Sequence, residues 1–176
     1  MARALLVVPD WGLSVNLYWR TRRLLEQQGF QVKVAAPRRE QIEQLAFILM
    51  PDLDLAQAKG GDYDLVVFVA GHGNRDLWNH PEAHRVGREA VAAGKVVGAS
   101  GAAVPILANA GLLRGRRATG PLSVAGVLKQ AGADYTADQV TVDAGIVTLR
   151  RSEAFESFGQ QLLEQVRLRE EARKAA

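Results

Sequence analysis

One stretch in the middle of the chain joins a strand pattern, a corner of small residues and a helix pattern. It reads GKVVGASGAAVPILANAGLL, residues 94–113, with Ser100 and Gly101 at the corner. This order is typical of a nucleophile elbow, in which a sharp turn between a strand and a helix exposes a reactive side chain. Gly101 has no side chain that could react. Ser100 is therefore the candidate nucleophile at this corner, because it carries a hydroxyl.

A serine hydroxyl becomes an effective nucleophile when a neighbouring general base takes its proton. His72, in the sequence AGHG, ends a second buried-strand pattern and can supply such a base. Against this, a small residue such as Ser100 is also ordinary in the packing between sheet and helix, hydrogen-bonded to the backbone. Two interpretations stay open: a catalytic Ser100–His72 pair, and a corner that has lost its chemistry.

Two further histidines, His80 and His84, are four residues apart on a predicted helix. That spacing is found in two-histidine metal sites, but no third ligand follows from the sequence. Cysteine is absent altogether, which removes thiolate ligands, cysteine nucleophiles and disulfides. We expect no metal and no cofactor, and we interpret both histidines as ordinary helix residues.

Four aromatic residues lie close to the predicted corners. Trp11 and Trp78 follow two strand patterns and can wall one cleft, whereas Tyr18 and Trp19 lie on the first predicted helix. Aromatic side chains are common both in cores and at interfaces between subunits. Cleft walls, core packing and dimer packing are therefore all open interpretations of these four residues.

Strand and helix patterns alternate along the chain. The predicted strands are 3–9, 30–37, 63–73 and 95–100, with either a two-strand hairpin or a bent strand at 140–149. The predicted helices are 14–28, 79–94, 102–113, 124–132 and 152–173. Asn79 and Glu82 have the spacing of a capping box at the start of one helix. Residues 38–61 have a weak pattern, which predicts a short helix before Pro51 and an irregular return.

This alternation predicts an α/β fold, a three-layer sandwich with a mainly parallel sheet and helices on both faces. Ligands of such sheets bind at the carboxyl ends of the strands. The corners after 3–9, 63–73 and 95–100 should therefore meet at one cleft.

The composition limits the other possibilities. A chain of 176 residues with 48% hydrophobic content predicts one domain, residues 1–176, with a polar tail that frays from about residue 167. No apolar run is long enough for a membrane span or a signal peptide, so we expect a cytoplasmic protein without membrane contact. The net charge of +3 comes from arginines spread along a chain with only 6% aromatics, which argues against nucleic-acid binding.

Several segments together resemble the ThiJ/PfpI family of the class I glutamine amidotransferase-like superfamily. They are GFQVKVAAP, DYDLVVFVAGHG, GKVVGASG, AGLLRGRRATG and VTVDAGIVTLR, and their order covers nearly the whole chain. AGLLRGRRATG is the most specific of them. The resemblance implies a flavodoxin-like sandwich that is usually dimeric, in a family that includes peptidases, glyoxalases or deglycases, and chaperones.

The resemblance also shows what is missing. Active members are similar at an elbow written A-x-C-H-G, and an ungapped comparison puts Gly101 at the cysteine position and Ala102 at the histidine position. The family's supporting glutamate falls near Ser14, and its P-G-G corner falls on residues 69–71. The former active-site cleft would be lined by Trp11, Ser14, Gly71, His72, Gly73, Ser100, Gly101 and Ala102.

These observations favour a protein that has lost cysteine-dependent hydrolase or glyoxalase chemistry and acts by binding or interaction. We expect a homodimer with a small-molecule ligand in the strand-end cleft and no catalytic residue. The alternative is a hydrolase or glyoxalase-type enzyme that uses Ser100 or His72 on a small carbonyl, amide or ester compound. A weaker alternative is a chaperone-like protein with an apolar dimer surface.

Overall fold

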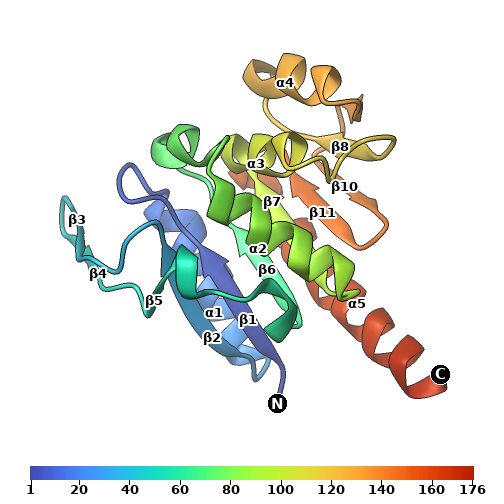
Figure 1. Ribbon diagram of the computed structural model, residues 1–176, viewed down its shortest axis with the longest axis horizontal. Helices are drawn as coiled ribbons and strands as arrows, with labels where there is room; N and C mark the ends of the chain where they lie inside the picture. The colour runs from blue at the N-terminus through green and yellow to red at the C-terminus, as the bar shows by residue number, and fades with distance from the viewer.

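A seven-stranded sheet forms the centre of the computed structural model, which describes residues 1–176 (Figure 1). The strand order is β10-β11-β7-β6-β1-β2-β5, and only β10 runs antiparallel to its neighbour. The strands are β1 (Arg3–Val7), β2 (Gln31–Ala36), β5 (Leu53–Asp54), β6 (Leu65–Phe68), β7 (Val96–Ser100), β10 (Val140–Asp143) and β11 (Ile146–Leu149).

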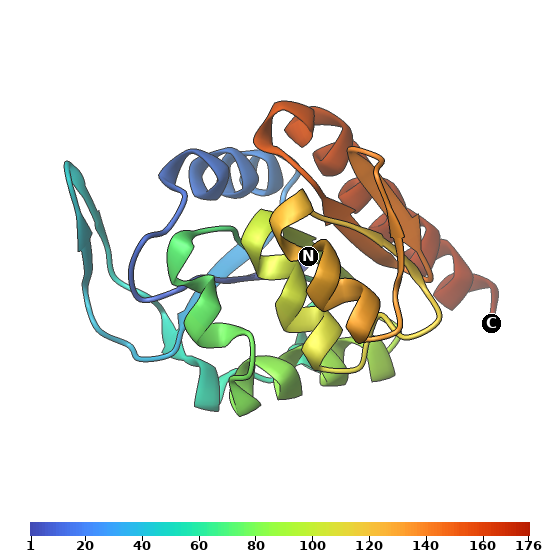
Figure 2. The same ribbon diagram turned by 90° about the horizontal axis from the view of Figure 1, so that it is seen from above.

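Helices cover both faces of this sheet, as the view from above shows (Figure 2). Successive residues of a strand point to opposite faces, so Leu5 and Val7 join one core while Leu6 and Val8 join the other. The first core lies under α2 (Pro81–Ala92), α3 (Val104–Asn109) and α4 (Ala125–Gln130), and the second lies under α1 (Val15–Gln27) and α5 (Phe155–Ala175). The predicted three-layer α/β sandwich is confirmed.

Short elements complete the chain. A small parallel pair, β8 (Arg117–Thr119) and β9 (Asp134–Thr136), was absent from the expected elements. The 3-10 helices are η1 (Leu55–Gln57), η2 (Gly60–Asp62), η3 (His72–Leu77), η4 (Gly101–Ala103), η5 (Leu122–Val124) and η6 (Ser152–Ala154). No helix is at once long enough and apolar enough to cross a membrane.

The segment before Pro51 is a β-hairpin, so the predicted short helix is wrong. Its strands are β3 (Ile42–Gln44) and β4 (Phe47–Leu49), which pair only with each other. Phe47 packs edge-on against Tyr18 and Trp19 of α1 at ring-centroid distances of 5.8 and 6.2 Å. This tertiary contact, which a local pattern cannot reveal, favours the extended conformation.

The start of α2 also differs from expectation. His80, not Asn79, is the N-cap, because its Nδ1 atom accepts hydrogen bonds from the backbone N–H groups of Glu82 and Ala83. The side-chain oxygen of Asn79 instead accepts a hydrogen bond from Asn109 at 3.0 Å. The predicted Asn79–Glu82 capping box is therefore wrong.

The terminal helix α5 continues through Ala175. Arg169 donates a hydrogen bond to the carbonyl oxygen of Ala144 in the turn between β10 and β11. A Cβ atom on Gly145 would lie only 2.4 Å from this guanidinium group, so the glycine permits the close approach. The contact ties the start of the polar tail to the sheet.

Candidate functional site

Three loops meet at the carboxyl edge of the sheet. β1, β6 and β7 are parallel neighbours, so the chain leaves all three strands at the same edge. A pocket of about 420 Å³ opens there. Its lining residues are Gly12, Leu13, Ser14, Leu17, Ala70, Gly71, His72, Ala102 and Ser152. We call this the strand-end pocket.

Backbone hydrogen bonds join the first two loops into one wall of the pocket. Leu13 and Gly71 form an isolated antiparallel bridge. On either side of it, the Ser14 N–H donates to the carbonyl of Ala70 at 2.9 Å, and the His72 N–H donates to the carbonyl of Gly12 at 2.8 Å. A Cβ atom on Gly71 would lie 2.4 Å from the Gly12 oxygen, so this approach requires glycine.

The turn after β7, which we call the elbow, has a left-handed residue at its apex and no reactive side chain there. Gly101 has φ +53°, a left-handed conformation that costs glycine little. A Cβ atom there would lie 3.3 Å from the Cβ of Ala70, which is tight. The indole N–H of Trp78 donates a hydrogen bond to the carbonyl of Ala102 at 2.7 Å, and this bond stabilises the turn.

Ser100 does not line the pocket. It is 3% exposed, and its hydroxyl oxygen accepts a hydrogen bond from the backbone N–H of Ala70 at 3.0 Å. No hydrogen bond joins Ser100 to His72. The hydroxyl therefore fastens β7 to the loop after β6 from within the packed interior.

The polar side chains in the pocket are one imidazole and two hydroxyls. His72 is exposed to solvent and lines the wall. The hydroxyl of Ser14 caps α1 by accepting a hydrogen bond from the Leu17 N–H at 3.4 Å. Ser152 accepts a hydrogen bond from Arg20, but through its backbone carbonyl, which leaves its own hydroxyl unused. No carboxylate belongs to the lining, so the wall holds no acid to support a nucleophile.

The expected site residues fall into two groups. Ser14, Gly71, His72 and Ala102 lie together in the lining of the pocket. Trp11, Gly73, Ser100 and Gly101 lie outside it. Gly73 is buried against the loop after β1, where a Cβ atom would lie 2.1 Å from the carbonyl oxygen of Trp11, so Gly73 permits two loops to touch rather than shaping the cavity.

Five lining residues were missed by sequence reasoning: Gly12, Leu13, Leu17, Ala70 and Ser152. The first four are small or apolar residues beside corners that were identified, and the rule that ligands bind at strand ends could have included them. Ser152 belongs to η6, which precedes α5, and no local signal places that segment beside the loop after β1.

The four aromatic residues contribute to packing and to surface contacts, not to the strand-end pocket. Trp78 lies beneath the elbow, against the core, and Tyr18 is 1% exposed. Trp11 is 52% exposed and donates its indole N–H to Asp76 at 2.7 Å. Trp19 is 53% exposed beside the β3–β4 hairpin. None of the four residues lines the strand-end pocket.

The two helix histidines are used locally. His80 caps α2, and the Nε2 atom of His84 is 2.7 Å from the carbonyl oxygen of Trp78. Trp78 supports the elbow, and His84 contacts Trp78. Together, the side chains of His80 and His84 fix the segment between η3 and α2.

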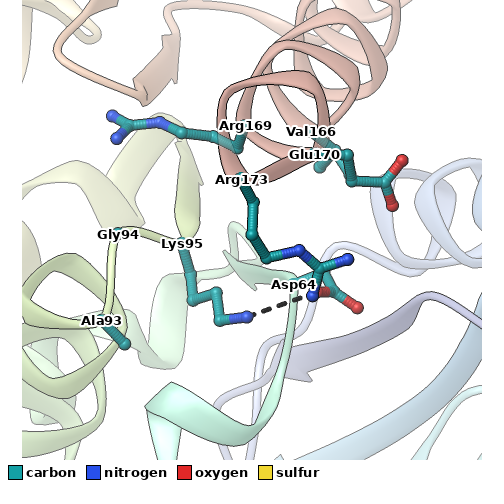
Figure 3. Close-up of a pocket in the computed structure, with 8 residues that line it drawn as sticks. All are labelled: Asp64, Ala93, Gly94, Lys95, Val166, Arg169, Glu170 and Arg173. Atoms are coloured by element: carbon teal, nitrogen blue, oxygen red, sulfur yellow. Dashed lines mark hydrogen bonds and ion pairs between the residues drawn. The ribbon is translucent and has the colours of Figure 1, made fainter. Parts of the chain in front are cut away.

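A second, smaller hollow of about 140 Å³ lies between the ends of α2 and α5 (Figure 3). It is ionic: Lys95 approaches Asp64 at 3.4 Å, and α5 contributes Arg169, Glu170 and Arg173. Asp64 precedes β6 and Lys95 precedes β7, so this hollow is at the amino edge of the sheet. The strand-end pocket is the larger of the two and combines apolar walls with a few polar groups, as ligand sites do.

The sheet order, the left-handed elbow and the strand-end pocket define an α/β sandwich of the flavodoxin-like kind. The chain belongs to the DJ-1/PfpI family, whose family model matches residues 3–165. The chain has no cysteine.

Similar proteins include both uncharacterised and named members. An uncharacterised protein of Methanocaldococcus jannaschii is 26% identical over 94% of this chain and 82% of its own length. A deglycase of Pyrococcus abyssi is 28% identical over 84% of this chain and 89% of its own length. Among solved structures, a ThiJ/PfpI domain protein from Brachyspira murdochii has a TM-score of 0.88 at 21% identity, covering 94% of this chain and 96% of that one.

Proposed function

We propose that this chain is a DJ-1/PfpI family protein that binds a small molecule without covalent chemistry, in the strand-end pocket, and that it works in the cytoplasm as a homodimer. The observation that carries the proposal is the elbow. Gly101 retains the left-handed turn beneath a pocket of about 420 Å³, while no thiol or carboxylate lines that pocket. A retained cavity without a nucleophile supports binding over turnover.

The chemistry of the pocket suits a small, largely uncharged compound. Leu13, Leu17, Ala70 and Ala102 supply apolar surface, and His72 supplies an imidazole that can donate or accept one hydrogen bond. No lysine or arginine belongs to the lining, which disfavours a strongly anionic ligand. A compound with one carbonyl or amide group fits this set.

Catalysis on a small carbonyl, amide or ester compound is the second candidate. It is favoured by the position of His72 in the pocket and by relatives that carry the name deglycase. Ser100 is a weak nucleophile in this candidate, because it is buried and its hydroxyl oxygen already accepts a hydrogen bond. A chaperone-like role would require apolar surface, which the β3–β4 hairpin offers.

Binding can be tested by mapping amide chemical shifts during titration with acetamide and with methylglyoxal. We expect shifts at Gly12, Gly71 and His72. Ala102→Leu fills part of the pocket and should reduce them, whereas the matched change Ala93→Leu, in the ionic hollow, should not. Shifts that are the same in both variants would contradict binding at this site.

Turnover is tested on the same samples. Lactate formation from methylglyoxal should stay at the uncatalysed background. Activity above background that disappears in both Ser100→Ala and His72→Ala would overturn the proposal and establish the enzymatic candidate.

A further inference from the structure

We propose that the ionic hollow between the ends of α2 and α5 is a second binding site, and that it takes a phosphate group, either free or carried by a small phosphate ester. The hollow lies at the amino edge of the sheet, whereas the strand-end pocket lies at the carboxyl edge. The two sites are separate, and neither one requires the other.

Positive charge is in excess in this hollow. Its lining contains three cationic side chains, Lys95, Arg169 and Arg173, and two carboxylates, Asp64 and Glu170. One pair of opposite charges is in contact there: Lys95 lies 3.4 Å from Asp64, and each side chain is 27% exposed. Neither arginine has a carboxylate partner, so two guanidinium groups remain available to an anion.

Arg167, on the same helix, shows that arginines of α5 can pair when they lie outside the hollow. It contacts Glu164 at 2.6 Å and also pairs with Glu171. Glu170 and Arg173 have a spacing of three residues that permits such a pair, yet their side chains extend in different directions (Figure 3). Arg173 reaches from α5 into the hollow, where it can meet an anion from solution.

The other two cations are held in place by the surrounding structure. Lys95 contacts Asp64, which itself accepts a hydrogen bond from the Arg3 N–H at 2.9 Å. Arg169 donates a hydrogen bond to the Ala144 carbonyl at 3.1 Å. A lysine has three donors and an arginine has five, so both residues keep donors free for a ligand. Side chains that are already positioned lose less freedom when a ligand binds.

The size and charge of the hollow fit one phosphate group. Its volume of about 140 Å³ equals that of about five water molecules at roughly 30 Å³ each. Guanidinium groups bind phosphate oxygens in pairs, and a lysine adds a point charge. A phosphate ester carries a charge of about −1.5 to −2 at neutral pH, which matches two unpaired guanidinium groups better than the single charge of a carboxylate. Gly94 and Arg173 are exposed, so the rest of an ester can project into solvent.

A bound phosphate would fasten the end of α5 to the sheet. Val166 is the last buried residue of this helix, and beyond it only Arg169 forms a hydrogen bond to another element. A ligand that contacts both Arg173 and Lys95, the residue before β7, adds a second connection. We therefore expect binding to slow amide hydrogen exchange in residues 170–175.

Binding is tested on the full chain by amide chemical shifts during titration with inorganic phosphate, at constant pH and with sodium chloride keeping the ionic strength constant. Gly94 and Lys95 should shift and reach saturation, whereas Gly12 and Gly71 in the strand-end pocket should not shift. Saturation confined to the strand-end pocket, or no saturation at all, would overturn the proposal.

A parallel titration with glycerol 3-phosphate distinguishes the two sources of the phosphate group. Saturable shifts at Gly94 and Lys95 with both compounds would assign the hollow to phosphate esters as well as to the free ion. Saturable shifts with inorganic phosphate alone would assign it to the free ion.

Two variants separate local contacts from overall charge. Arg173→Gln removes the guanidinium group at an exposed position and should weaken phosphate binding about tenfold or more. Lys174→Gln removes one positive charge from the next residue, which does not line the hollow, and should weaken binding less than about twofold. Equal affinities in the two variants would overturn the proposal, because the hollow would then act only through its net charge.

The connection to α5 is tested by amide hydrogen exchange on the same samples. Phosphate should slow exchange in residues 170–175 of the parent and of Lys174→Gln, but not of Arg173→Gln. Exchange rates in the parent that do not change at saturating phosphate would refute this connection.

Discussion

At the scale of the single residue, the proposed loss of cysteine chemistry depends on Gly101. Restoring the family residue with Gly101→Cys should destabilise the fold by about 1 kcal/mol or more, because a Cβ atom is forced into left-handed backbone and against Ala70. The new thiol should react as an ordinary thiol near neutral pH, since Ser14 and Ala102 provide neither acid nor imidazole. Thermal denaturation and a thiol-reactivity titration measure both effects. A variant with parental stability and a thiolate at neutral pH would show that the corner is still organised for catalysis.

The turn at Gly101 could be predicted from the sequence, because the pattern that indicates it is local. A strand pattern followed by small residues and a helix pattern leaves few conformations, and the structure has the expected turn at Gly101. The direction of Ser100 into the interior was expected from the ungapped comparison with the family, which puts Gly101 and not Ser100 at the apex of the turn. The position of Ser152 in the pocket was not predictable, because it depends on how α5 packs against a loop about 140 residues earlier in the chain.

At the scale of the element, the buried strands and long helices were predicted and the short pieces were not. The strand pattern in β6, where all four residues are buried, is unambiguous. The strands of the β3–β4 hairpin have three residues each, which is too short for an alternating hydrophobic pattern to appear in the sequence. Phe47 favours their extended conformation, but it does so through contacts with α1. Short elements of this kind are decided by tertiary packing.

A network of polar contacts holds α2 to the chain before β6. Arg85 donates hydrogen bonds to Glu89 and to the carbonyls of Leu55 and Ala58, and Glu89 accepts a further bond from the Gly60 N–H at 2.9 Å. Desolvation acts to raise the pKa of Glu89, but the bonds from Arg85 and Gly60 outweigh it and hold the pKa below its ordinary value.

This network predicts a specific pH dependence. A carboxyl whose pKa is lower in the folded state stabilises the fold above its unfolded pKa, near 4.5, and this stability is lost as the pH falls through the lower folded value. Glu89→Gln should therefore reduce the free energy of unfolding at neutral pH and flatten its decrease below about pH 4.5. Urea unfolding from neutral pH to about pH 3 measures this, with Glu156→Gln, at an exposed position of α5, as the control. Parallel curves for parent and Glu89→Gln would contradict the prediction.

At the scale of the whole molecule, self-association should appear in the thermal stability. A partner that binds only the folded chain raises Tm with protein concentration. Over a roughly hundredfold range of concentration, we expect Tm to rise by about 3 to 5 °C in the wild-type chain. Calorimetric scans at several concentrations measure this, and a Tm that is constant in the wild type would argue against a dimer.

The overall architecture was predictable because alternating strand and helix patterns permit few arrangements. What could not be predicted was which surface is left uncovered, since exposure depends on the whole packing. Trp19 and Leu45 are ordinary apolar residues in the sequence, and only the folded molecule shows that both are open to solvent.

The strand order has a consequence for the way the chain leaves the ribosome. β7 pairs with β6 on one side and with β11 on the other, and β11 begins about 45 residues after β7 ends. At typical translation speeds of about 5–20 residues per second, those residues take roughly 2 to 9 s to be synthesised. Throughout that interval the newly made β7 presents an unpaired edge to the cell, so the nascent chain is most open to misassociation just before its last strand appears.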